Sequence, residues 1–551
     1  MTATYWFSRP AQRAECHPEP AGRIPFRVRL GVTGHRMLTD EPAVAEAVRN
    51  RLRLLEQWFP DTNATPVVFS IVSALAEGAD RLVAATVLEK FEGADVRLEA
   101  VLPFPADVYR RDFRAPQSAT EFDQLLKRAA SVVTVPEVPD PLEAYERAGQ
   151  HVVDRCDVLV AVWNGHAASG RGGTADIVAY ARQQNVHVIV VDADQPESGS
   201  GAGATRPRCL EGLASAFARI EAYNRLSLDA PGPSELLEDH VRVLERVAHR
   251  SAIHWSCQQV ADWALPHFAR ADYLALRHQR RYNQLGATLF AASAFAVTAV
   301  AAQVVFKPSR PVWAILEVAL MLLLLTGFLL GRRSGAHDRW IAYRSLAEAF
   351  RAALFIALTG HREQSAGDDG TIGGDPGAHW FQRAFSEAWR RRPLVEQRDA
   401  DAAELGRVLA EAWIADQIAY HRSFVVKARR RQSIMTSGIV TLFACTLLVG
   451  TLHVVDVAHE EPWPDVFSFL AITLPGFGAA LTGIRDQRLY RLHSERSTRT
   501  ADRLERVRRA TATETSLATI QALALEAQAL VVQENVDWSG VIEFQDVEII
   551  L

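Results

Sequence analysis

Four stretches in the second half of the chain consist almost entirely of apolar residues. The first, 282–306, and the third, 432–455, contain no Asp, Glu, Lys or Arg, and the second, 311–331, is interrupted only by Glu317. The fourth is 466–484. A helix of about 20 apolar residues crosses the core of a bilayer, whereas a helix on the surface of a soluble domain shows a polar face. The pattern therefore favours four membrane spans over four buried core helices.

Basic residues gather at one end of each stretch. The loop 456–465, between the third and the fourth, has neither Lys nor Arg, and the loop between the first and the second has only Lys307 and Arg310. Because Lys and Arg accumulate in cytoplasmic loops, we expect two hairpins with both termini in the cytoplasm, and Trp313 and Trp463 at the outer interface. The basic flanks are Arg277, Arg280, Arg281, Arg332, Arg333, Lys427, Arg429, Arg430, Arg431, Arg485, Arg488 and Arg491.

Short β-rich runs alternate with helical spacing in the N-terminal third. The run 157–163 is almost continuously apolar, as expected for a strand buried on both faces. Helical spacing covers 43–59, a segment ending near residue 90, and 175–184. The alternation predicts an α/β, Rossmann-like doubly wound parallel sheet, followed by an all-α membrane region with four transmembrane helices in two hairpins. The expected strands are 27–32, 67–72, 96–102, 131–135, 157–163 and 186–191.

Polar and glycine-rich segments follow three of the expected strands. In such sheets ligands bind outside the carboxyl ends of the strands, where the strand order reverses. Backbone N–H groups at the start of a helix bind phosphate, and glycines let the backbone approach it. We therefore expect a nucleotide site formed by three groups of residues: Gly31, Thr33, Gly34, His35 and Arg36; Ser73, Glu77, Gly78 and Asp80; and Trp163, Asn164, Gly165, Arg171, Gly172, Gly173, Thr174 and Asp176.

Each of these segments, taken singly, also fits an ordinary turn ahead of a helix. Thr174 is a suitable N-cap, and Asp80 or Asp176 suits a first helical turn. The three together, each between a strand and a helix, favour a nucleotide site. His35 could act as a general base, but its place between a glycine and an arginine favours a polar contact with a ligand.

Composition and charge exclude several classes of protein. The chain has 551 residues, of which 48% are hydrophobic and 23% charged, and its net charge of −5 provides no cationic field for nucleic acid. Its five cysteines are scattered without a CxxC pair, which argues against a zinc site and a disulfide scaffold. His151, His166 and His187 lack metal-ligand spacing, so we expect neither a metal nor a cofactor.

Composition along the chain indicates eight segments. Residues 194–207 are rich in Gly and Ser and indicate a linker, 364–377 indicate a disordered cytoplasmic loop, and 537–551 form an acidic and apolar tail with β character. The expected order is an irregular segment (1–26), a nucleotide-binding domain (27–195), a linker (196–207), a helical stalk (208–281), a first hairpin module (282–360), a cytoplasmic linker with helices (361–412), a second hairpin module (413–532) and the tail (533–551).

The two hairpins share short motifs in the same order. An Arg-Arg pair precedes each hairpin, and a Tyr-Arg-x-x-x-Glu motif follows each, beginning at Tyr343 and at Tyr490. These motifs lead into expected helices over 347–358 and 497–532. Coincidence among arginine-rich flanks is the alternative, but the common order favours a duplication. With the Trp-Ile-x-Asp-Gln-x-x-Tyr motif at Trp413, the hairpins resemble the SLATT family, two-helix membrane modules proposed as pore-forming effectors of bacterial defence.

The N-terminal third carries the motifs GVTGHR, SALAEGADRLVA and VAVWNG…GRGGTADIVAYA. Over about residues 27–195 they resemble the SLOG superfamily of Rossmann-like domains. That superfamily includes phosphoribohydrolases and non-catalytic sensors of nucleotide or NAD-derived signals. The hydrolase signature has an acidic pair after its Gly-Thr, whereas here only Asp176 follows Thr174. The resemblance therefore implies sensing more than turnover.

Together the resemblances imply a membrane effector of bacterial anti-phage defence. A cytoplasmic domain would sense a nucleotide or NAD-derived second messenger and gate a pore or membrane-disrupting homo-oligomer in the cytoplasmic (inner) membrane. A membrane-tethered nucleotide hydrolase is the enzyme alternative. A transporter is the third possible function, and the scarcity of charged residues in the spans argues against it. Glu317 either serves the membrane function or reaches the outer interface.

Overall fold

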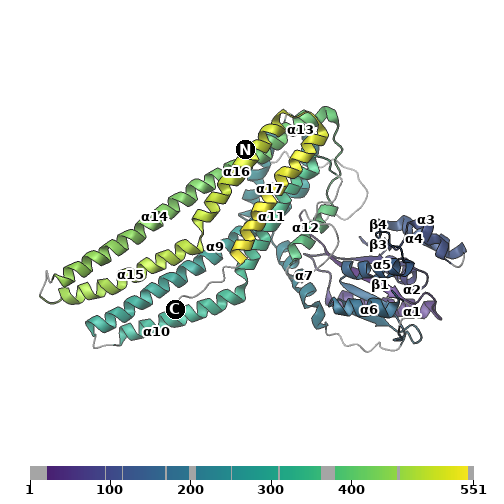
Figure 1. Ribbon diagram of the computed structural model, residues 1–551, viewed down its shortest axis with the longest axis horizontal. Helices are drawn as coiled ribbons and strands as arrows, with labels where there is room; N and C mark the ends of the chain where they lie inside the picture. Colours follow the sequence, from purple (N-terminus) through teal and green to yellow (C-terminus); the bar gives the residue numbers. More distant parts are fainter. Residues whose placement is uncertain are drawn as a thin grey trace.

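A six-stranded parallel sheet and a set of long helices form the two parts of the molecule. The computed structural model describes residues 22–92, 95–113, 116–167, 171–197, 206–249, 251–307, 311–361, 379–455 and 460–543. In Figure 1 the sheet and its helices lie at one end, and the longest helices extend away from it toward the other. The predicted succession of a parallel α/β part and a helical part with four long apolar helices is confirmed.

The sheet has the strand order β4-β3-β2-β1-β5-β6, and every neighbouring pair is parallel. The chain adds strands on one side of β1 up to β4 and then crosses to the other side for β5. The carboxyl ends of β1 and β5 are therefore adjacent where the order reverses. All six strands lie within two residues of their predicted bounds: β1 Phe26–Gly34, β2 Val67–Ser73, β3 Arg97–Leu102, β4 Ala129–Thr134, β5 Val158–Val162 and β6 His187–Val191.

Two hydrophobic clusters fix the helices on the faces of the sheet. Ile71 belongs to the cluster that packs against α1 and α2, while the next residue, Val72, belongs to the cluster that packs against α5 and α6. Successive strand residues point to opposite faces, so helices cover both. The helices are α1 Glu41–Trp58, α2 Ala79–Lys90, α3 Ala106–Tyr109, α4 Pro116–Arg128, α5 Pro141–Arg155 and α6 Thr174–Gln183, with a short 3-10 turn at Arg110–Asp112.

The C-terminal part consists of helices joined by turns and short irregular segments, without a strand among its described residues. It comprises α7 Glu211–Asn224, α8 Pro233–Ala248, α9 His254–Phe306, α10 Val312–Ser334, α11 Ala336–Leu358, α12 Trp380–Arg390, α13 Ala402–Val408, α14 Ala415–Val454, α15 Trp463–Gln487, α16 Tyr490–Thr513 and α17 Leu517–Glu543, with 3-10 turns at Arg208–Leu210 and Asp399–Asp401 and a π-helical turn at Leu409–Ile414.

Three sequence-based expectations, for two helices and the tail, need correction. The expected stalk, 208–281, comprises α7, α8 and the first part of α9, which continues without a break into the expected first span. The helix expected over 347–358 begins earlier, at Ala336, and the one expected over 497–532 is divided into α16 and α17. The β character expected for the tail is wrong as far as Glu543, which ends α17. The loop expected at 364–377 lies outside the described residues, as do most of the linker and the first 21 residues.

The helices α9, α10, α14 and α15 are long and apolar enough to cross a membrane. Helix α9 packs against α10 and α15, and α15 packs in turn against α14, so the four lie in a row (Figure 1). Small residues allow the close approach of α10 to α9: a Cβ added at Gly331 would lie 2.8 Å from Leu285 Cδ2. Large apolar side chains of α10, such as Ile315 and Leu322, remain exposed, which suits contact with lipid.

Buried ion pairs join α12 to the sheet. Arg27 Nε lies 2.8 Å from Glu387 Oε2, and Arg27 Nη2 lies 2.9 Å from Glu387 Oε1, with side chains only 2% and 4% exposed. Arg383 Nη1 donates to Asp157 Oδ2 over 2.9 Å. Arg27 lies at the start of β1 and Asp157 directly precedes β5. The contact with the helical part is therefore made at the amino ends of the two central strands.

Candidate functional site

A cavity of about 600 Å³ opens at the carboxyl ends of β1 and β5, where the strand order reverses. Its walls come from the segments that follow β1, β2 and β5, and from α3, α5 and the start of α6. The sequence-predicted residues that line it are Thr33, Gly34, His35, Arg36, Asp80, Trp163, Asn164, Arg171, Gly172, Gly173 and Thr174. The other six, Gly31, Ser73, Glu77, Gly78, Gly165 and Asp176, are not among its lining residues.

The segment after β1 is held against the segment after β5. His35 Nε2 accepts a hydrogen bond from the Asn164 N–H over 3.3 Å, and the His35 carbonyl accepts one from the Ala79 N–H over 3.0 Å. Because Nε2 is already an acceptor, this arrangement gives His35 a positioning role at the cavity rather than that of a free base. Gly34 must be small here, since an added Cβ would lie 2.5 Å from Ala79 Cβ.

Three predicted residues of the β2–α2 segment support the loop rather than the cavity. Gly78 has φ +80° and precedes α2, and an added Cβ would lie 2.4 Å from Arg36 O, so both its conformation and the space require glycine. The Ser73 hydroxyl accepts from the Leu75 N–H over 3.0 Å. Glu77 accepts from the Ser118 hydroxyl, which directs its carboxylate toward α4.

Asp80 is the buried carboxyl group of the cavity, with 6% of its surface exposed. Burial raises the pKa of Asp80 to about 7, against the opposing effects of the Ala76 N–H and the charges of Arg36 and Arg81. A group with such a pKa is partly protonated near neutral pH and is able to exchange a proton there. Asp80 is therefore a candidate for acid–base chemistry at the cavity.

The segment between β5 and α6 differs from the N-cap expectation. Gly173 is the N-cap and Thr174 is the first helical residue, without a side-chain capping bond. Asp176 Oδ2 accepts from the Gly172 N–H over 3.1 Å, so one backbone donor of the loop already has an anionic partner. Arg171 is ion-paired, with its Nη1 3.4 Å from Asp140 Oδ2 and a second pair to a carboxylate of α5.

Two further glycines have packing or turn roles. A Cβ at Gly31 would lie 2.6 Å from Cys156 Sγ, so this position permits β1 to pack against the end of α5 and does not approach the cavity. Gly165 has φ +83° and faces open space.

Sequence reasoning missed the aromatic wall of the cavity. Tyr109 and Tyr145 line it from α3 and α5, and the Arg36 guanidinium lies over the Tyr145 ring, 5.0 Å from its centroid. The sequence signals of helix α5 are clear, because Asp140 caps it, Pro141 begins it, and the apolar residues Ala144, Ala148 and Val152 recur at four-residue spacing along its buried face. Those signals predict the helix, but not which side chain faces a ligand.

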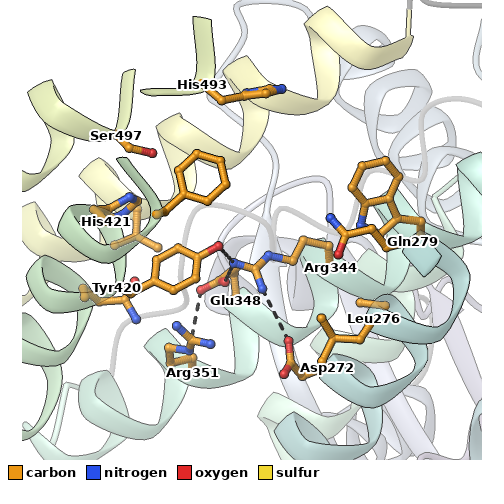
Figure 2. A pocket seen from close by; sticks show the side chains of 15 residues that line it. Asp272, Leu276, Gln279, Arg344, Glu348, Arg351, Tyr420, His421, His493 and Ser497 are labelled. Atoms are coloured by element: carbon orange, nitrogen blue, oxygen red, sulfur yellow. Dashed lines mark hydrogen bonds and ion pairs between the residues drawn. The ribbon is translucent and has the colours of Figure 1, made fainter. Parts of the chain in front are cut away.

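A second cavity of about 300 Å³ lies among α9, α11, α14 and α16 (Figure 2). The buried Glu348 carboxylate lies at its centre, with Arg344 Nη2 2.6 Å and Arg351 Nε 3.7 Å away. Arg344 also reaches Asp272 of α9, and it donates to the Tyr420 hydroxyl of α14 over 3.2 Å. This network connects the segment after the first hairpin to the helix that leads into the second.

The repeated motif therefore has two different environments. Arg344 and Glu348 form a buried pair, whereas the corresponding Arg491 and Glu495 are 81% and 49% exposed. Sequence reasoning identified both copies only as signs of duplication. The structure separates them, because one copy is a packing element and the other a surface pair.

Glu317 contacts the neighbouring apolar helix. Its Oε2 accepts a hydrogen bond of 2.7 Å from Gln303 Nε2 of α9. The carboxylate therefore has a partner on the other helix of the first hairpin. Within the described ranges, no group of three or more His, Cys, Asp or Glu residues is placed to hold a metal ion.

No family model matches the chain, and no curated protein matches it. The functional argument therefore rests on the cavity, the ion pairs and the apolar helices.

Proposed function

We propose that this chain is a membrane effector in which a Rossmann-like domain senses a nucleotide or NAD-derived signal and gates the membrane part. One observation carries the proposal: a cavity of about 600 Å³ lies at the strand-order reversal of a parallel sheet, in a chain that also has four helices of membrane-spanning length. Ligands of parallel α/β sheets bind at this position, and the volume falls in the usual range for small-molecule sites.

The lining supports an anionic ligand with a planar group. The backbone of Gly173 and Thr174 forms the start of α6, where N–H groups favour phosphate. The Arg36 guanidinium, which lies over the Tyr145 ring, forms no ion pair among the residues that the structure describes and offers a ligand both a positive charge and a planar face. The resemblance of the sequence motifs to SLOG sensors supports the same ligand class.

The membrane part is proposed to form two SLATT-like hairpins, α9 with α10 and α14 with α15, with both termini on the cytoplasmic side of a bacterial inner membrane. The arginine flanks and the exposed apolar side chains of α10 support this placement. Four helices in a row leave two outer helices, α10 and α14, available to other copies, which supports a homo-oligomer. Signal binding would shift that oligomer toward a conducting or bilayer-disrupting state in anti-phage defence.

Dye release from liposomes tests the proposal. Full-length protein is reconstituted with trapped dye, and cyclic nucleotides and ADP-ribose derivatives are added in turn. One of them should trigger release, and Gly173→Asp should abolish the response, because a carboxylate would occupy the start of α6. Asn50→Asp, which adds the same negative charge on the exposed face of α1 outside the lining, is the matched control and should respond like wild type. Release that is equal with and without every compound, at all protein densities, contradicts gating.

A nucleotide hydrolase is the second candidate, and Asp80 favours it. A buried carboxyl group with a pKa of about 7 is suited to general acid catalysis. Product formation from the bound nucleotide over several turnovers, lost in Asp80→Asn, would select this alternative. Intact nucleotide after long incubation would select the sensor.

A further inference from the structure

A third cavity, of about 450 Å³, lies between α9 and the junction of α10 with α11. It combines two kinds of lining. Leu285 and Leu330 give it an apolar side, and the guanidinium groups of Arg281, Arg333 and Arg339 give it a basic side. The apolar side continues the apolar surfaces of α9 and α10, while the basic side lies where these surfaces end. The cavity is therefore amphipathic along the helix direction.

The positive charge of this cavity is not neutralised within the described part of the chain. Arg281, Arg333 and Arg339 form no ion pair and no side-chain hydrogen bond among the described residues, and no described Asp or Glu lines the cavity. His278, another lining residue, is 7% exposed, and its Nδ1 has no hydrogen-bond partner there. A buried imidazole nitrogen without a hydrogen-bond partner and a set of uncompensated arginines thus face the same space.

This lining selects an anionic amphiphile over a simple anion. A free phosphate would contact the arginines and leave the leucines without a partner. A phospholipid places its phosphate near arginine and its acyl chain along apolar helix surface, and basic pockets at the cytoplasmic ends of membrane helices are suited to such headgroups. Arginine also matches phosphate geometry through paired N–H donors.

We propose that this cavity binds the headgroup of an anionic phospholipid of the cytoplasmic leaflet, with Arg281, Arg333 and Arg339 around the phosphate and an acyl chain along Leu285 and Leu330. The inference rests on the membrane placement in the proposed function, and it does not depend on signal binding. Its consequence is that lipid composition affects the stability of the junction between α10 and α11.

Lipid titration of the full-length protein in neutral detergent tests this site. The melting temperature is followed while phosphatidylglycerol, phosphatidylcholine or inorganic phosphate is added. Phosphatidylglycerol should raise the melting temperature at lower concentration than phosphatidylcholine, and phosphate should have little effect. Each of Arg333→Gln and Arg339→Gln should raise the half-maximal phosphatidylglycerol concentration about five-fold, the effect of one basic residue near an anionic surface. Arg333→Lys should retain most of the response.

Arg332→Gln is the matched control, because the Arg332 guanidinium lies over Phe328, 5.7 Å from the ring centroid, and does not line the cavity. The half-maximal phosphatidylglycerol concentration of this control should stay within two-fold of the wild-type value. An equal loss in Arg332→Gln, or no preference for phosphatidylglycerol, overturns the site. If inorganic phosphate alone raises the melting temperature as much as phosphatidylglycerol does, the cavity binds a soluble anion, and the lipid site is also overturned.

Flotation with phosphatidylcholine liposomes distinguishes this inference from the proposed function. Protein that floats with neutral liposomes but shows no headgroup preference refutes the lipid site and leaves the membrane placement intact. Protein that fails to float removes the premise of both. Headgroup preference without any signal-triggered dye release refutes gating alone.

Discussion

Glu387→Gln tests how firmly α12 is joined to the sheet. Burial tends to raise the pKa of Glu387, but the hydrogen bond and charge of Arg27 and the charge of Arg391 outweigh it and hold the pKa at about 2, from an ordinary 4.5. A lowering of about 2.5 pKa units corresponds to about 3 kcal/mol. Both Arg27 and Glu387 are buried, so solvent screening reduces this value little. Breaking a buried pair by removing one partner costs about 3–5 kcal/mol, which agrees with it.

The pH dependence follows from the sign of the shift. A carboxylate whose pKa is lowered by folding stabilises the native state above its unfolded pKa, and this contribution is lost as the pH falls from about 4.5 toward 2. The difference in stability between wild type and Glu387→Gln should therefore be fully present at pH 7. It should shrink below about pH 4.5 and vanish near pH 2.

Hydrogen exchange is the suitable assay, because a chain with several cooperative units has no single free energy of unfolding. At pH 7 peptides from α12 and from the start of β1 should exchange about 100-fold faster in Glu387→Gln, which is the equivalent of about 3 kcal/mol. Glu495→Gln is the control: its partner Arg491 is 81% exposed, and exposed pairs contribute little. Exchange at α12 within three-fold of wild type would refute the reasoning. In a double variant with Arg27→Met the two effects should be less than additive.

Two further changes have expected outcomes at the other cavities. Folding raises the pKa of Asp80, so its ionisation destabilises the native state as the pH rises from about 4 to about 7. In Asp80→Asn the melting temperature should therefore fall less over this pH range than in wild type. Equal slopes of melting temperature against pH for the two proteins would contradict this. Glu348→Gln removes the buried carboxylate that Arg344 and Arg351 share and leaves Arg344 with the Asp272 carboxylate. The melting temperature of this variant in detergent should fall by several degrees, whereas an unchanged value would show that the network of Figure 2 does not hold the hairpins together.

Strong local patterns were sufficient to predict the strands and the apolar helices. The run in β5, Val158–Val162, is buried along its whole length, and a strand covered on both faces must be apolar at every position. The apolar helices are equally clear, because each is longer than a bilayer core is thick. In both cases the neighbouring residues of the sequence carry the information.

Roles that depend on distant contacts were not predictable in the same way. Gly31 resembles a ligand-binding glycine, yet it makes room for Cys156, and the sequence does not say which helix packs there. The Arg344–Tyr420 contact joins residues 76 positions apart, so a local motif could not reveal the cavity that they line. Tyr145 was missed because an aromatic residue on an amphipathic helix is ordinarily a core residue. Tyr145 faces the site only because α5 packs over the carboxyl end of β1.

The positions of the cavity and the ion pairs limit how a signal could reach the membrane. The cavity lies at the carboxyl ends of β1 and β5, and the pairs of Arg27 and Asp157 lie at the amino ends of the same strands. A nine-residue strand such as β1 spans about 30 Å and is stiff within a sheet. A ligand shifts a conformational equilibrium only through its different affinity for the two states. Since strands do not lengthen, the proposed gating would act through displacement of the sheet domain as a whole, together with α12, relative to the membrane helices. Loosening the ion pairs should therefore uncouple release from signal without weakening signal binding.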